Sequence, residues 1–248
     1  MNMLANLTSS DDIQQDRDVL DGSKLWETDV YDTTIKLAYL NKSEGGALAL
    51  VIHAVNEEGS EIRFSNWITS GNAKGNLNYY EKDGKKHYLP GYNIANAICQ
   101  LTVDKEINAM VTETKKVKLY NKAASAEVPT DVEVLVELLD QKITLGVVKQ
   151  TVNKQVKDGP NGYVMTNEPR DENDVSKVFH TETRKTVTEI RGQVEEAEFV
   201  KKWLEQNKGK TVNKFKDGGA AVAGGATGGA PKAAGAPAAA KKSLFSKE

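Results

Sequence analysis

The sequence has few of the residues that disulfides, metal sites and membrane spans require. Its 248 residues include one cysteine, Cys99, and three histidines, His53, His87 and His180. One cysteine excludes an intrachain disulfide and favours a reducing, cytoplasmic compartment. The histidines are far apart and no His-x-x-x-His or Cys-x-x-Cys spacing occurs, so we expect no metal site. No run of about 18 apolar residues occurs, so we expect no membrane span.

Motifs for nucleotide and nucleophilic chemistry are also missing. The sequence contains no GxxxxGK[ST], no GxSxG and no GxGxxG after a strand-like segment. Carboxylates are abundant, but no spacing pairs them as a catalytic dyad or a metal-binding set. We therefore expect neither a cofactor nor an enzyme. A metal-dependent nuclease stays open as an alternative, because acidic metal sites assemble from distant positions. The GNAKG run at residues 71–75 either cradles a phosphate through backbone amides or is a plain loop.

The small net charge of -2 hides an uneven distribution of charge along the chain. From Lys208 to the end, eight lysines oppose two acids, so this part carries +6 and the rest carries -8. The acids gather before residue 30, and residues 63–122 hold ten cations and five acids. Such sorting fits a protein that binds a polyanion, although charge runs are also common on plain solvated surfaces.

Strand periodicity dominates the first part of the chain after a polar, acidic start. Apolar and polar residues alternate from Thr28, and two further strand candidates lie at residues 47–55 and 61–69. Turn-rich segments at residues 41–46 and 56–60 separate them. Three strands in meander order are the expected start of a small antiparallel barrel.

A short helix and further strands follow. Apolar residues recur at three- and four-residue spacing between residues 94 and 101, which indicates one buried helix face. Residues 117–120, 132–139 and 143–152 are β-prone, and residues 140–142 are expected to turn the last two into a hairpin. This order matches an OB-fold. We therefore predict a mainly β fold with a few helices, arranged as an OB-like antiparallel barrel.

Composition divides the chain into three parts. Residues 1–25 are acidic and expected to be loosely ordered, and they lack the basic start and apolar run of a secretory signal. Residues 26–207 form the predicted OB-like domain, with a polar excursion at 153–185 and a terminal helix at about 189–206. Residues 208–248 are basic and rich in Gly, Ala and Pro, which predicts a flexible tail.

The most informative stretch runs from residue 63 to residue 99, where aromatic rings alternate with cations. Asp83-Gly84 is a hairpin signal, so Tyr79-Tyr80 and His87-Tyr88 become the two legs of a finger. Flat rings stack on unpaired bases and cations neutralise phosphates, which is what binding of a single strand without sequence readout requires. Adjacent tyrosines in a strand point to opposite faces, so we expect at most one of this pair to be buried.

Individual rings also have a purely structural interpretation. Trp67, near a strand end, suits the core and the contact surface equally, whereas Trp203 on an apolar helix face is expected in the core. The residues that we predict to contact nucleic acid are Arg63, Trp67, Lys74, Tyr79, Tyr80, Lys82, Lys85, Lys86, Tyr88, Lys115, Lys116 and Tyr120.

The last residues form a distinct motif at the end of the predicted tail. Lys241 and Lys242 precede Leu244 and Phe245, so two large apolar side chains are framed by lysines. This pattern is typical of a short docking peptide for a protein partner. The alternative is an inert terminus that is open to proteolysis.

Three parts of the sequence closely resemble the single-stranded DNA-binding proteins of tailed bacteriophages. They are WITSGNAKGNLNYYEKDGKKHYLPGYNIANAIC, EVPTDVEVLVELLDQKITLGVVKQTVNK and the Ala/Gly/Pro tail that ends in KKSLF. The resemblance implies an OB-like fold, binding of single-stranded DNA during phage replication and recombination in the host cytoplasm, and no catalysis.

One feature departs from this resemblance, because many single-strand binders end in an acidic tail and this chain ends in a basic one. The expected partners are single-stranded DNA and, through the tail, a replication, recombination or transcription protein. Oligomeric state stays open. The alternative to DNA binding, besides a nuclease, is a protein-interaction or virion structural module.

Overall fold

The computed structural model describes residues 25–121, 124–157 and 163–217. Over these residues the chain is mainly β, with antiparallel pairing throughout most of the sheet and three α-helices, which confirms the predicted class. The strands are β1 Asp29–Lys42, β2 Leu48–Asn56, β3 Glu61–Trp67, β4 Tyr79–Lys82, β5 Lys85–Tyr88, β6 Thr112–Asn121, β7 Ala126–Leu135, β8 Lys142–Lys157, β9 Tyr163–Phe179 and β10 Thr211–Asn213. The helices are α1 Pro90–Val103, α2 Val187–Arg191 and α3 Phe199–Asn207.

The main sheet is built around β1, which has different partners along its length. One edge of β1 pairs with β2, which pairs with β3, so the predicted meander is confirmed. On the other edge, the first half of β1 pairs with β8 and residues Tyr39 and Leu40 pair with β7. A bulge between Ile35 and Leu37 separates the two halves. Strand β9 lies outside β8, and no pairing between β9 and β3 closes the sheet over the described residues.

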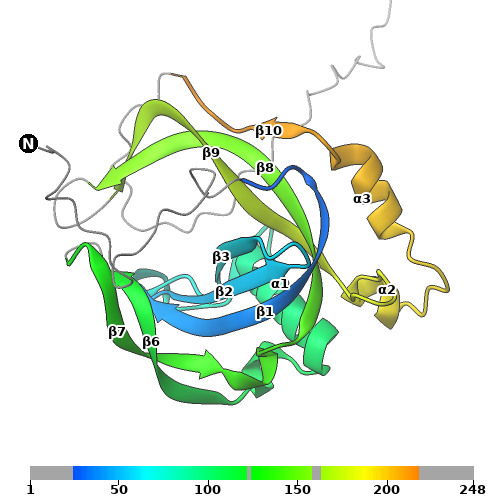
Figure 1. Cartoon of the computed structure of the whole chain (residues 1–248), viewed down its shortest axis with the longest axis horizontal. Coiled ribbons are helices and arrows are strands. Elements are labelled where there is room, and N and C mark those ends of the chain that lie inside the picture. The colour runs from blue at the N-terminus through cyan, green and yellow to red at the C-terminus, as the bar shows by residue number, and fades with distance from the viewer. Residues whose placement is uncertain (1–24, 122–123, 158–162, 218–248) are drawn as a thin grey trace, which may run out of the picture.

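The core lies inside the curve of this sheet, and α1 fills its open side (Figure 1). Pro90 is tolerated at the first helical position because the N–H there needs no intrahelical partner. Buried side chains of α1 recur at three- and four-residue spacing, as predicted, and include Ile98 and Cys99. The helix contacts β3, β8 and β9, so it occupies the gap between the two unpaired edges.

The predicted hairpin between residues 132–139 and 143–152 is wrong. Strand β7 pairs with β6 instead, and β8 pairs with β9. The intervening turn is held against β1, because Asp140 N–H donates to the Ile35 carbonyl and Ile35 N–H donates to the Gln141 carbonyl. The chain therefore continues from β7 to β8 along the same edge of β1 and does not fold back on itself.

The segment at 153–185, expected to be an irregular excursion, contains the outer part of a long β8–β9 hairpin. Figure 1 shows this hairpin arching away from the body, which explains why its sequence is polar on both faces. The expected terminal helix is two helices, α2 and α3, with Gly192 ending the first. Trp203 is buried as predicted, and it packs so closely on Gly146 that a Cβ there would lie 3.2 Å from the indole.

Two predicted parts of the chain lie outside the described residues. They are the acidic N-terminal segment up to residue 24 and the tail from residue 218, with its Lys241, Lys242, Leu244 and Phe245.

Candidate nucleic-acid interface

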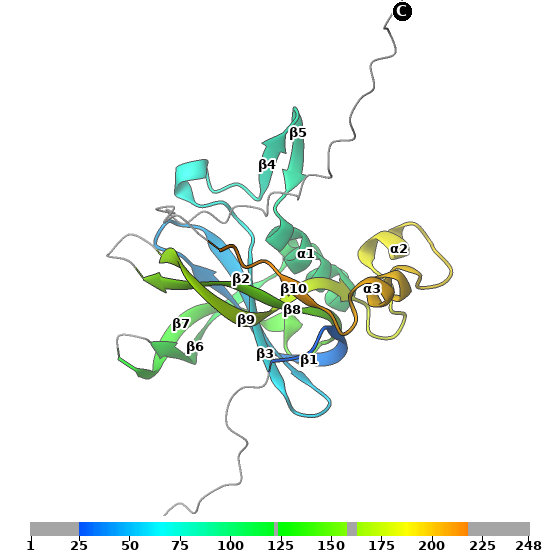
Figure 2. The same ribbon diagram turned by 90° about the horizontal axis from the view of Figure 1, so that it is seen from above.

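Strands β4 and β5 form the predicted finger, a separate two-stranded sheet that projects from the body (Figure 2). Asp83 and Gly84 connect the strands with φ values of 52° and 69°. Two consecutive positive φ angles define the type I′ turn that suits a two-residue hairpin. Tyr79 is half-buried, and every other strand residue of the finger is exposed.

The finger has two faces, and each carries rings and at least one cation. Because side chains alternate along a strand, the register Tyr79↔Tyr88 and Tyr80↔His87 fixes both sets. The Tyr79 face comprises Tyr79, Glu81, Lys86 and Tyr88. The Tyr80 face comprises Tyr80, Lys82, Lys85 and His87. The Tyr80 face thus has two lysines and no acid, whereas Glu81 lies directly opposite Lys86 on the Tyr79 face.

Ring contacts organise both faces. The Tyr80 and His87 rings are stacked, with centroids 5.6 Å apart and planes inclined by 29°. On the other face, Lys86 Nζ lies 4.8 Å from the centroid of the Tyr79 ring. Cross-strand pairs of this kind hold rings in place on a short hairpin. The side chains are therefore presented in a defined arrangement although they are exposed.

The base of the finger is fixed to α1 and to the end of β3. Tyr88 stacks on Tyr92 in the first turn of α1, with centroids 4.7 Å apart, and Tyr92 is buried. Gly91 packs against Trp67 so tightly that a Cβ would lie 2.4 Å from the Trp67 carbonyl oxygen. Trp67 itself is 39% exposed, so it is not a core residue and is accessible for the predicted contact. The end of β3 thus lies against the first turn of α1, at the root of the finger.

Because side chains alternate along a strand, Arg63, Ser65 and Trp67 lie on the same, exposed face of β3. Arg63 Nη2 donates a hydrogen bond to the Tyr39 hydroxyl at 3.0 Å. His53 lies opposite Arg63 in the sheet. Burial lowers the pKa of His53, and the nearby Arg63 lowers it further. Of these two residues, Arg63 and not His53 therefore carries the positive charge at neutral pH. Nothing in the sequence pointed to Tyr39 as its partner.

The 71–75 loop does not form a phosphate cradle. Its 3₁₀ turn, Asn72–Lys74, uses its own amides, because the N–H groups of residues 74, 75 and 76 donate to the carbonyls of Gly71 and Asn72. The N–H of Asn72 donates to the carbonyl of Gly45 in the β1–β2 turn. These N–H groups already donate to carbonyl oxygens, so they are not available to a phosphate. Lys74 remains as an exposed cation on the loop that leads into the finger.

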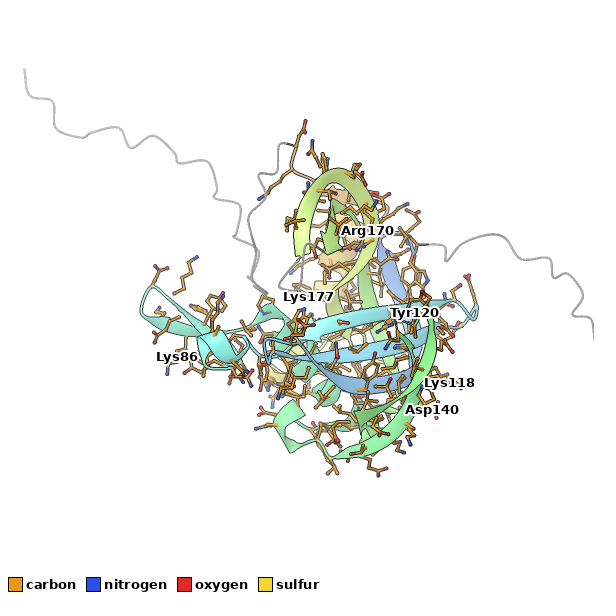
Figure 3. All side chains as sticks on the ribbon, turned by 90° about the vertical axis from the view of Figure 1, so that its left-hand side faces the viewer. Lys86, Lys118, Tyr120, Asp140, Arg170 and Lys177 are labelled. Carbon is orange, nitrogen blue, oxygen red and sulfur yellow. The ribbon has the colours of Figure 1, made fainter. Side chains whose placement is uncertain are left out.

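The second predicted cluster lies on the β6–β7 hairpin, away from the finger. Figure 3 places Lys86 at one side of the molecule and Tyr120 and Lys118 at the other, and Figure 2 also separates the two hairpins. Lys116 and Tyr120 share one face, where the residues directly opposite are Asp131 and Glu127. Lys115 is on the other face, and its Nζ lies 3.3 Å from the Glu113 carboxylate. The structure thus does not bring these residues into one track with the finger lysines.

Three further observations concern the chain as a whole. Within the ranges that the structure describes, no group of three or more His, Cys, Asp or Glu side chains could hold a metal ion. No helix in those ranges is both long enough and apolar enough to cross a membrane. In comparisons with known proteins, the chain matches no protein-family model and no curated protein.

Proposed function

We propose that this chain is a non-catalytic protein that binds and coats single-stranded DNA during phage replication and recombination. The observation that carries the proposal is the finger, an exposed hairpin with stacked rings and cations on both faces. Among the described residues, there is no ion pair that includes Lys82, Lys85 or Lys86. These lysines are available to phosphates.

The finger combines the two terms that sequence-independent binding of a single strand needs. Base stacking on an aromatic side chain is worth about 1–3 kcal/mol per base and tolerates any base. Exposed lysines neutralise phosphates and release counterions. Trp67 and Arg63 extend the same combination from the finger root along β3, and Lys74 adds a cation on the adjoining loop. We propose that the strand follows this path.

The sheet order supports the proposal of an OB-like barrel. In the path β9–β8–β1–β2–β3, each strand pairs with the same neighbours as in a five-stranded OB barrel. The helix α1 follows β3, the third strand of this path in chain order, and precedes β8 and β9. The barrel would be open between β3 and β9, where α1 packs. OB-folds bind oligonucleotides on the face of their second and third strands, and here the exposed face of β3 carries Arg63 and Trp67.

Two parts of the proposal lie away from the finger. Lys115, Lys116 and Tyr120 would be outlying contacts, since acids on β6 and β7 offset their charge. Lys241, Lys242, Leu244 and Phe245 would recruit a replication, recombination or transcription protein. Deletion of residues 241–248 should leave DNA affinity unchanged and abolish capture of that partner from phage and host extract. Unchanged capture would refute the role of the tail.

Fluorescence anisotropy with a labelled oligo-dT, with and without magnesium, tests the main proposal. Tyr79→Ala/Tyr80→Ala, which removes one ring from each face, should weaken binding at least about tenfold. Phe199→Ala, which removes an exposed ring from α3, is the matched control and should bind as the unmodified protein does. No binding at low salt would refute the proposal and favour a protein-interaction or virion structural module. Magnesium-dependent cleavage would favour a nuclease.

A further inference from the structure

We infer that the two faces of the finger bind two separate single strands at the same time, so that one molecule bridges two DNA strands. This inference rests on the proposed function and adds an activity to it. A protein that holds two strands on either side of one thin hairpin brings complementary sequences together, which promotes annealing.

Each face of the finger is equipped to bind a strand by itself. The Tyr80 face has the stacked Tyr80 and His87 rings with Lys82 and Lys85 beside them. The Tyr79 face has Tyr79 and Tyr88 directly opposite each other, with Lys86 over the Tyr79 ring. A finger that used one face only would need its exposed rings on that face. The rings are instead divided equally between the two faces.

A single strand that used both faces would have to pass over the tip of the finger or around one of its two edges. The backbone of β4 and β5 separates the faces along the whole length of the hairpin. The tip is the Asp83-Gly84 turn, where the side chain is an acid and the glycine offers no surface for stacking. Passing over the tip would bring phosphates close to a carboxylate, which is unfavourable. Two strands, one on each face, avoid this crossing.

The faces also differ in a way that suits two strands with different attachments. The Tyr79 face continues into the body through the Tyr88–Tyr92 stack and the neighbouring Trp67, so its strand can follow β3. The Tyr80 face has two lysines and no acid, so its strand depends more on phosphate contacts. We expect the second strand, on the Tyr80 face, to be released first as salt rises.

A bridging assay tests the inference. A biotinylated oligo-dT is immobilised, the full chain is added at low salt, and capture of a second, fluorescent oligo-dT is measured. Both strands are oligo-dT, and thymine does not form Watson–Crick pairs with thymine, so the strands do not pair with each other. The unmodified chain should capture the second strand. Tyr80→Ala/His87→Ala and Tyr79→Ala/Tyr88→Ala should each lower capture about tenfold or more while still binding the immobilised strand.

Charge variants show whether the ring variants lose capture only because the hairpin is locally disrupted. Lys85→Glu reverses a charge on the Tyr80 face and Lys86→Glu on the Tyr79 face, and both leave all rings in place. Each should also lose capture, whereas Phe199→Ala on α3 should bridge normally.

The possible results separate the inference from the proposed function. If the unmodified chain binds the immobilised strand but captures no second strand, the inference is wrong and the proposed function stands. If both single-face variants still bridge fully, bridging comes from oligomers with one strand per subunit, and the inference is again wrong. If the chain does not bind the immobilised strand at all, the proposed function and the inference fall together.

Discussion

Replacement of the three finger lysines should change how DNA binding depends on salt. Lys82, Lys85 and Lys86 are exposed and free of ion pairs within the described part of the chain, and Lys74 is the next exposed cation on the loop before them. On a single strand, each neutralised phosphate contributes about −0.7 to the slope of log K against log salt. Summed over both faces of the finger, these four lysines contribute about −2.8 to the slope of the unmodified protein, in addition to any contribution from Arg63. The variant Lys82→Gln/Lys85→Gln/Lys86→Gln would keep only about −0.7 of this lysine contribution.

These slopes translate into a clear difference in affinity. From about 50 mM to about 200 mM salt, the lysine contacts alone should account for a loss of about 50-fold in affinity in the unmodified protein and only about threefold in the variant. Fluorescence anisotropy with oligo-dT at several salt concentrations measures both slopes. The thermal unfolding midpoint should be nearly the same, because exposed side chains that form no ion pair contribute little to stability.

A variant with the same net charge serves as the control. Lys36→Gln/Lys201→Gln/Lys202→Gln removes three exposed lysines that pair with Asp140, Glu196 and Glu198. It should keep the slope of the unmodified protein, because these lysines do not belong to the finger. The reasoning fails if the finger variant keeps the full slope, or if the control loses as much slope as the finger variant does.

Three further predictions concern stability and reactivity. Gly91→Ala should destabilise the fold by at least about 2 kcal/mol in urea unfolding, because its Cβ would clash with the Trp67 backbone, whereas Gly59→Ala, in open space, should cost only about 1 kcal/mol. Burial would raise the pKa of Glu189, but N–H donors at the starts of α2 and α3 hold this pKa below its ordinary value. The ionised carboxylate therefore stabilises the fold above about pH 4.3, and this stabilisation is lost as the pH falls through the lowered pKa. Glu189→Gln should therefore cost about 1–3 kcal/mol at neutral pH and flatten the acid limb of a stability–pH curve. Burial raises the pKa of Cys99 to about 12, so Ellman's reagent should label this thiol only after unfolding; rapid labelling of the folded protein would contradict its burial.

Features that depend on neighbouring residues could be predicted from the sequence. Period-two alternation identified β1, strand-like segments between turn signals identified β2 and β3, and the turns predicted their meander order. The Asp83-Gly84 pair predicted the finger and, by counting from the turn, its opposing residues. These features rest on local steric preferences and side-chain alternation, which act whatever the rest of the chain does.

Features that depend on distant contacts could not be predicted. β7 does not form a hairpin with β8, because the turn between them is bonded to Ile35, more than 100 residues earlier in the chain. The backbone of Trp67 packs against Gly91 of α1, and the partner of Arg63 comes from β1. The separation of the β6–β7 hairpin from the finger also depends on the tertiary structure, because β7 pairs with β1 whereas the finger lies between β3 and α1 (Figures 2 and 3). The sequence by itself determined the finger and its rings and cations, because turn type and alternation are local. Only the tertiary structure decided which side chains share a surface, because that depends on how strand edges and apolar faces far apart in the chain are buried together.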